Sequence, residues 1–198
     1  MSGTFPSSPA FNSVDIKSFQ PTFVSRSISG RRQARQIGGQ YFLMTATFPP
    51  MTRAQFAPIS AFIKRQRGEY ESFQIVPPVL STGMGSPAGT PLVNGGSQTG
   101  RSVVTDGWNN TTLIFKADDF IKFANHDKVY TVIADSTSDG SGNATLSIEP
   151  ALVTSPAENS AITYSSVPFT VALTNPIQEY RTGAGGLFSF ELDLEEVL

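Results

Sequence analysis

Most of the chain alternates short apolar runs with polar, turn-forming stretches, which is typical of β-strands joined by loops. Residues 41–48 are rich in aromatic and β-branched side chains and predict a strand, which ends at two prolines. Residues 72–76 predict another strand. Between them a helix is predicted at about residues 53–67, because apolar residues recur there at helical spacing: Phe56, Ile59 and Ile63. The central unit is therefore strand, helix, strand.

Two start points are open for this helix. Thr52, with Gln55 three residues later, has the form of a capping box, which is a helix-start signal. Pro58 lies inside the helix drawn from that start and would kink it. Alternatively, regular helix begins near Ala57 with Pro58 at the first helical position. The upstream capping box favours the longer helix.

The segments that precede the central unit are polar. Residues 2–13 contain prolines and are expected to be mobile. Residues 14–24 alternate loosely and predict one or two short strands. Residues 25–39 have almost no apolar side chains and hold four arginines: Arg26, Arg31, Arg32 and Arg35. This stretch is either a solvated hairpin or a surface that binds an acidic partner, since arginine suits bidentate contacts with carboxylates.

Glycine-rich sequence after Pro78 leads into a second module. Residues 80–91 are expected to form an exposed linker or long loop. Short β-rich runs then follow one another with turns between them, including a polar, glycine-containing turn at residues 135–143. The predicted strands include residues 111–115, 129–133 and 144–148. Hairpin-linked strands of this length predict a small β-barrel or sandwich of the OB-like kind.

The last strand alternates strictly. Its apolar positions are Phe188, Phe190, Leu192 and Leu194, and its polar positions are Ser189, Glu191, Asp193 and Glu195. This pattern predicts a half-buried strand with one acidic face. We expect it to pair with the first domain, which gives a domain of residues 1–80 plus 176–198 and an inserted β domain of residues 81–175.

Composition excludes several classes of site. The formal net charge is −2, so the whole chain gives no electrostatic case for nucleic acid or membrane binding. The chain has no cysteine, which excludes disulfides, zinc–cysteine sites and thiol nucleophiles. The sequence from residue 1 shows no signal-peptide pattern, and no apolar run is long enough for a membrane span.

Candidate catalytic and binding residues are few. His126, the only histidine, lies between two predicted strands and is expected to be a turn residue. Residues 135–140 resemble the opening of a calcium loop, but Leu146 stands at the twelfth position, where such a loop needs a glutamate. Trp108 could stack a sugar, although a lone tryptophan is more often packed inside. We find no active site, cofactor motif or metal site.

Two longer stretches carry a family resemblance. SGRRQAR, followed by residues 41–78 with an RG-x-x-x-x-F strand, is similar to the first domain of distal tail proteins and related minor tail-tip proteins of tailed bacteriophages. The stretch KADDFIKFANHDKVYTVIADSTSDGSGNATLSIEPAL resembles a phage structural segment with a K-A-G-D turn. Asp118 stands here in place of the glycine of that turn. The resemblance covers about residues 26–80 and 92–175.

The resemblance implies a structural protein and no enzyme. The fold is expected to be mainly β with one flanking helix: a tail-tube-like β-sandwich or split barrel carrying the inserted OB-like barrel. Such proteins assemble as rings, commonly hexamers, that join the tail tube protein to hub or baseplate proteins, with DNA as cargo in the channel. The implied location is the virion tail, assembled in the host cytoplasm without a membrane partner.

A head-to-tail ring contact is one hypothesis that follows. In it, the arginines of one copy (Arg26, Arg31, Arg32 and Arg35) meet the acidic last strand of another (Glu191, Asp193 and Glu195). Three alternatives stay open. They are a carbohydrate-binding tail module with weak glycan contact at Trp108, a cell-wall hydrolase, and a tube initiator or head-to-tail connector subunit.

Overall fold

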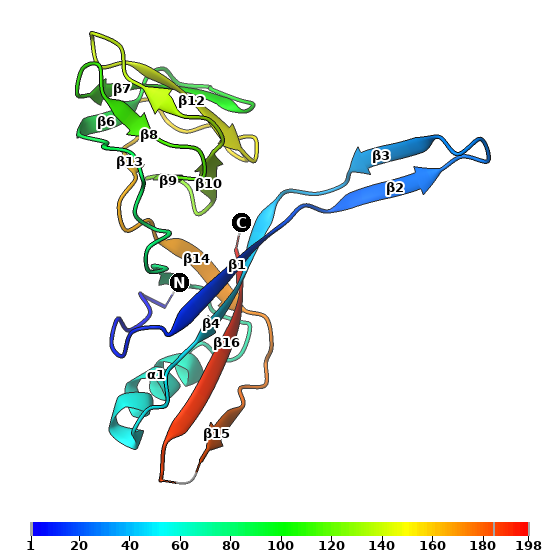
Figure 1. The fold of residues 1–198 in the computed structure, drawn as a ribbon, viewed down its shortest axis with the longest axis vertical. Coiled ribbons are helices and arrows are strands. Elements are labelled where there is room, and N and C mark those ends of the chain that lie inside the picture. Colours follow the sequence, from blue (N-terminus) through cyan, green and yellow to red (C-terminus); the bar gives the residue numbers. More distant parts are fainter. Residues whose placement is uncertain (1, 184, 198) are drawn as a thin grey trace.

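Two six-stranded sheets, a short two-stranded sheet, a helix and a projecting two-stranded hairpin make up the described part of the molecule (Figure 1). The computed structural model describes residues 2–183 and 185–197. In chain order the elements are β1 (Ser13–Phe19), β2 (Thr22–Arg26), β3 (Arg32–Gln36), β4 (Tyr41–Thr47), α1 (Arg53–Arg65), β5 (Phe73–Ile75), β6 (Gly89–Val93), β7 (Ser102–Trp108), β8 (Leu113–Phe115), β9 (Phe120–Phe123), β10 (Val129–Val132), β11 (Ser136–Thr137), β12 (Ala144–Glu149), β13 (Ile162–Thr163), β14 (Phe169–Leu173), β15 (Tyr180–Thr182) and β16 (Phe188–Glu196). The prediction of a mainly β fold with one flanking helix is confirmed.

The main sheet is antiparallel, with strand order β1-β4-β16-β14-β5 and β15 paired to β16. Helix α1 covers one of its faces. Ile59 and Ile63 of the helix are buried in the same cluster as Phe42 and Met44 of β4. The helix begins at Arg53, as the capping box predicts: the Thr52 amide donates to Gln55 Oε1 at 3.0 Å.

Strand β16 has the predicted alternation. Phe190, Leu192 and Leu194 are buried on the helix-covered side. The intervening acidic side chains are exposed on the other side, which we call the outer face of the main sheet: Glu191, Asp193 and Glu195. Because β16 lies between β4 and β14, this acidic strand is central in the sheet and has no free edge there.

The N-terminal segment is ordered, so the expectation of a mobile tail was wrong. Phe5 donates its backbone N–H to Gln74 O at 2.8 Å, and Gln74 donates back to Gly3 O at 2.9 Å. The Phe5 ring is buried and stacks on Phe11 with ring centroids 5.6 Å apart. Backbone pairing with β5 and two aromatic rings fix this segment, although its composition is polar.

Residues 81–167 form the second module, which we call the barrel. Its strand order is β13-β9-β10-β12-β7-β6. Leu92 in β6 also bridges to Ala161, next to β13, so the two ends of the sheet meet and the barrel is nearly closed. A separate core fills it, including Ile121, Tyr130 and Leu146. The linker expected at residues 80–91 is shorter, because β6 already begins at Gly89.

Strand β14 belongs to the main sheet. Its sequence position suggested the inserted module, which was expected to run to residue 175. However, Phe169 pairs with Ile75 of β5, and Leu173 pairs with Leu194 of β16. The inserted β-structure therefore ends before Phe169. Buried hydrophobic strands carry no sequence signal that says which of two sheets they join.

A buried polar contact connects the barrel to the main sheet. Lys128 Nζ, before β10, lies 2.5 Å from Glu196 Oε2, near the end of β16, and both side chains are almost fully buried. Glu196 also accepts the backbone N–H groups of Phe42 and Val129, at 3.2 and 2.9 Å. Burial lowers the pKa of Lys128 and raises the pKa of Glu196, and their pairing opposes both shifts.

Candidate functional site

The hairpin of β2 and β3 projects away from both sheets (Figure 1). We call residues 20–39 the arm. All residues from 22 to 39 are exposed except the half-buried Ser25. An isolated two-stranded hairpin is at best marginally stable in water. We therefore expect the arm to gain stability by packing against another surface.

Pairing places the four arginines on different sides of the arm. Arg26 pairs directly with Arg32, and Val24 with Ala34, so these four share one face. Arg35 pairs with Phe23 and lies on the opposite face. Arg31 lies in the turn beside the exposed Ile28. The sequence contains no Asp or Glu from residue 16 to residue 68, so no neighbouring carboxylate on the arm offsets these charges.

The outer face of the main sheet carries mainly the opposite charge, although Lys17 of β1 lies in the same row as Glu195. Glu191, Asp193 and Glu195 follow one another at every second position of β16. Asp15 of β1 lies in the same row as Asp193, since both pair with Thr45, and Thr45 Oγ1 donates to Asp193 Oδ1 at 2.9 Å. The three predicted acidic residues are thus together on one surface.

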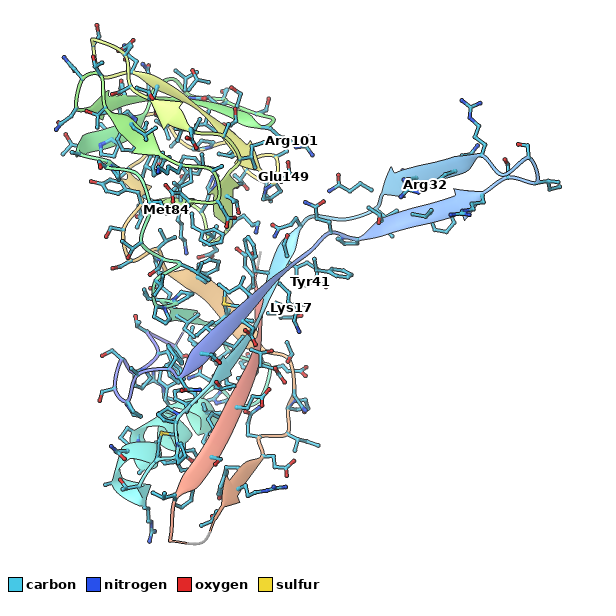
Figure 2. All side chains as sticks on the ribbon, viewed as in Figure 1. Lys17, Arg32, Tyr41, Met84, Arg101 and Glu149 are labelled. Atoms are coloured by element: carbon cyan, nitrogen blue, oxygen red, sulfur yellow. The ribbon has the colours of Figure 1, made fainter. Side chains whose placement is uncertain are left out.

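Within one copy these two surfaces stay apart. In Figure 2 the Arg32 side chain lies far out on the arm, while Lys17 and Tyr41 mark the main sheet from which the arm leaves. No salt bridge joins the arm to the outer face among residues 2–183 and 185–197. The arrangement leaves a basic projection and an acidic surface available for different molecules.

Trp108 does not present a sugar-binding face. Its side chain is 4% exposed, and its Nε1–H donates to Thr105 Oγ1 at 2.8 Å. The indole packs edge-on against Phe115, with ring centroids 5.3 Å apart. The suggestion of a glycan contact at this residue is therefore wrong, because the ring is a core group of the barrel.

His126 is buried at the turn between β9 and β10. Its Nδ1 lies 3.1 Å from the Tyr130 hydroxyl, which also accepts the Val153 amide at 3.3 Å. Burial lowers the pKa of His126, because the charged imidazolium loses solvent there. The sequence placed this residue in a turn but gave no sign of its burial.

Acidification should therefore destabilise the protein through His126. Because the pKa is lower in the folded protein, the unfolded chain binds the proton first as the pH falls. The free energy of unfolding is therefore highest above the unfolded-state pKa of about 6.5 and decreases as the pH drops through the folded-state pKa. The single histidine gives one imidazole signal in a proton NMR titration, and its midpoint should lie below 6.5. His126→Gln should remove this part of the pH dependence; a midpoint above 6.5 would contradict the assignment.

The remaining candidate loop is a structural turn. Asp139 Oδ1 accepts the backbone N–H groups of Ser141 and Asn143 at 2.7 and 2.9 Å. These hydrogen bonds lower the pKa of Asp139, and the bonds from Asn143 have the larger effect. In the described parts of the chain, no three acidic or histidine side chains gather closely enough to hold a metal ion. None of the helices there is long and apolar enough to cross a membrane.

Sequence reasoning missed a buried carboxylate beside the predicted Asp118 turn. Asp119 is buried and accepts three backbone N–H groups, from Met84 at 2.7 Å, Lys116 at 2.8 Å and Gly85 at 3.3 Å. It thereby fastens the entry loop of the barrel to the turn before β9. The two adjacent aspartates looked alike in sequence, and only the fold distinguishes the exposed one from the buried one.

The barrel has a recognisable family. Residues 81–167 match the family model described as the B domain of distal tail protein pb9. This part of the chain is similar to a distal tail protein B domain. The match ends between β13 and β14, where the structure returns to the main sheet.

This match supports the resemblance to phage distal tail proteins. A structural role in a bacteriophage tail, and a location in the virion tail, follow from it. No curated protein matches the chain.

Proposed function

We propose that the protein forms a ring, of six copies, at the tip of the tail, where it joins the tail tube protein to hub or baseplate proteins. The observation that carries this proposal is the exposed, basic arm beside an acidic sheet face that it does not contact in its own copy. A basic surface on one side and an acidic surface on another favour a head-to-tail contact between copies. Such contacts close into a ring when the rotation between neighbouring copies is a whole fraction of a full turn. The role is assembly, without catalysis, and DNA passes through the channel.

In this ring the two domains have different tasks. The main-sheet domain, residues 1–80 with the terminal strands, forms the ring, and the inserted barrel contacts neighbouring tail proteins. Assembly takes place in the host cytoplasm. A tube initiator or a head-to-tail connector uses the same kind of contact, but the distal tail protein B domain favours the tail tip.

Charge reversal on the arm should weaken the ring. Arg31→Glu/Arg32→Glu puts like charges opposite Glu191, Asp193 and Glu195 of the next copy, so association should fall by roughly tenfold or more. The measurement is the mass in solution by light scattering at low and moderate salt. Higher salt should also weaken the unmodified ring, because these charges are exposed.

Two further variants test whether the effect is specific. Arg53→Glu/Lys64→Glu makes the same change in net charge on α1 and should leave the ring intact. Glu191→Lys/Asp193→Lys, added to the reversed arm, should restore association. If the reversed arm assembles as well as the unmodified chain, the arm does not make the ring contact.

A further inference from the structure

A cleft of about 390 Å³ lies between the main sheet and the barrel, at the base of the arm. Ile16 and Phe42 line it from the main sheet, and Phe120 and Ile133 line it from the barrel. Ile133 is 51% exposed, and Leu80 on the linking segment is exposed as well. In the free chain, the cleft therefore leaves apolar side chains in contact with water.

Gln40 brings an unused acceptor to this cleft. The side chain is 2% exposed, and its Nε2 donates to Ser18 Oγ at 2.9 Å. Its Oε1 is buried without a hydrogen-bond partner. A buried acceptor without a partner is unfavourable, and an N–H donor that enters the cleft would pair with it.

Carboxylates lie at the rim of the same cleft. Glu149 pairs with Arg101 at 2.7 Å, and Figure 2 shows the two side chains together at the lower side of the barrel. Asp118 is exposed and has a φ of +79°, a left-handed conformation that favours glycine. The chain therefore keeps a carboxylate at the rim in a backbone conformation that is strained for most residues other than glycine.

The arm has the complementary chemistry. Its tip presents the fully exposed Ile28, followed by Arg31 and Arg32, which supply N–H donors and positive charge. At the base of the arm Gln20 Nε2 lies 3.5 Å from Glu149 Oε1 at the rim of the cleft, but the rest of the arm runs away (Figure 1), so the arm tip does not fill the cleft of its own copy. An occupant that is both apolar and cationic has to come from another molecule.

We propose that this cleft receives the arm tip of a second copy, with Ile28 on the apolar floor and the arginines at Asp118 and Gln40 Oε1. This inference rests on the proposed ring and names the acceptor site on the neighbouring copy. During association the acidic outer face attracts the arm over a distance, and in the closed ring the cleft holds the arm tip with Arg31 and Arg32. It also couples ring formation to the barrel, since Phe120 and Ile133 belong to it.

Cysteine cross-linking can locate the arm tip, because the natural chain has no cysteine. Ile28→Cys is mixed with Ile133→Cys under mild oxidation, and covalent dimers are counted on a denaturing gel. A disulfide needs Cα atoms within about 7 Å, so it reports direct proximity. Leu113→Cys, an exposed barrel position outside the cleft, is the matched control, and Ser189→Cys reports the outer face.

We expect cross-links between positions 28 and 133 and a yield at least tenfold lower with position 113. Cross-links to position 189 in place of 133 would overturn the cleft site and leave the ring proposal standing. A monomer that forms no cross-link with any partner would overturn both. As a second measurement, Ile133→Asp should weaken association measured by light scattering while Leu113→Asp does not; equal effects would contradict the cleft.

Discussion

Replacing Lys128 with methionine should cost about 3–5 kcal/mol of the free energy of unfolding, because it leaves the Glu196 carboxylate charged, buried and without its counter-ion. The loss is large for a domain whose whole stability is about 5–15 kcal/mol. Urea unfolding followed by fluorescence measures it. The contact joins the barrel to the last strand of the main sheet, so the barrel should also lose its fixed attachment in the variant.

An exposed ion pair provides the control. Arg101 and Glu149 are 2.7 Å apart, but their side chains are 54% and 27% exposed, so Arg101→Met should cost far less stability than Lys128→Met. The pH dependence of the stability of Lys128→Met gives a second test of the buried pair. Without Lys128, burial holds the pKa of Glu196 above its unfolded value, so stability should rise relative to the unmodified protein as the pH falls through that folded-state pKa. A cost no greater than that of Arg101→Met would show that the buried pair is not important.

Glu196 shows what sequence patterns reveal and what they leave out. The alternation from Phe188 to Glu195 predicted the buried and exposed sides of β16, because a strand repeats every two residues. The same rule puts Glu196 on the buried side, but it does not supply the lysine, which is 68 residues away in the chain. Local periodicity identifies strands; their partners depend on long-range pairing.

The same limit explains the other differences. The arm was recognisable in sequence from its four arginines, whereas its projection away from both sheets was not. Strand β14 has the composition of any buried strand, so its place in the main sheet depended on its partners, β5 and β16. The cleft at Gln40 combines residues from both modules and has no sequence signal of its own.

Replacing Asp119 with alanine should cost about 3 kcal/mol or more. The change removes the charged acceptor of three part-buried backbone N–H groups, those of Met84, Gly85 and Lys116, and each such hydrogen bond contributes about 1 kcal/mol or more. The loss should be local at first, since all three bonds hold the entry loop of the barrel. Hydrogen exchange of these amides, together with urea unfolding, measures both effects.

Neighbouring variants separate the acceptor role of Asp119 from simple loss of a side chain. Asp118→Ala changes the adjacent, exposed aspartate and should cost about 1 kcal/mol more than Asp118→Gly, which suits the φ of +79°. In the unmodified protein Asp119 Oδ1 accepts from Met84, and Oδ2 accepts from Gly85 and Lys116. Asp119→Asn keeps only one oxygen acceptor, so the loss of stability should be intermediate. If Asp119→Ala costs no more than Asp118→Ala, the three hydrogen bonds do not hold the loop, and its order would have to come from the aromatic core beneath it.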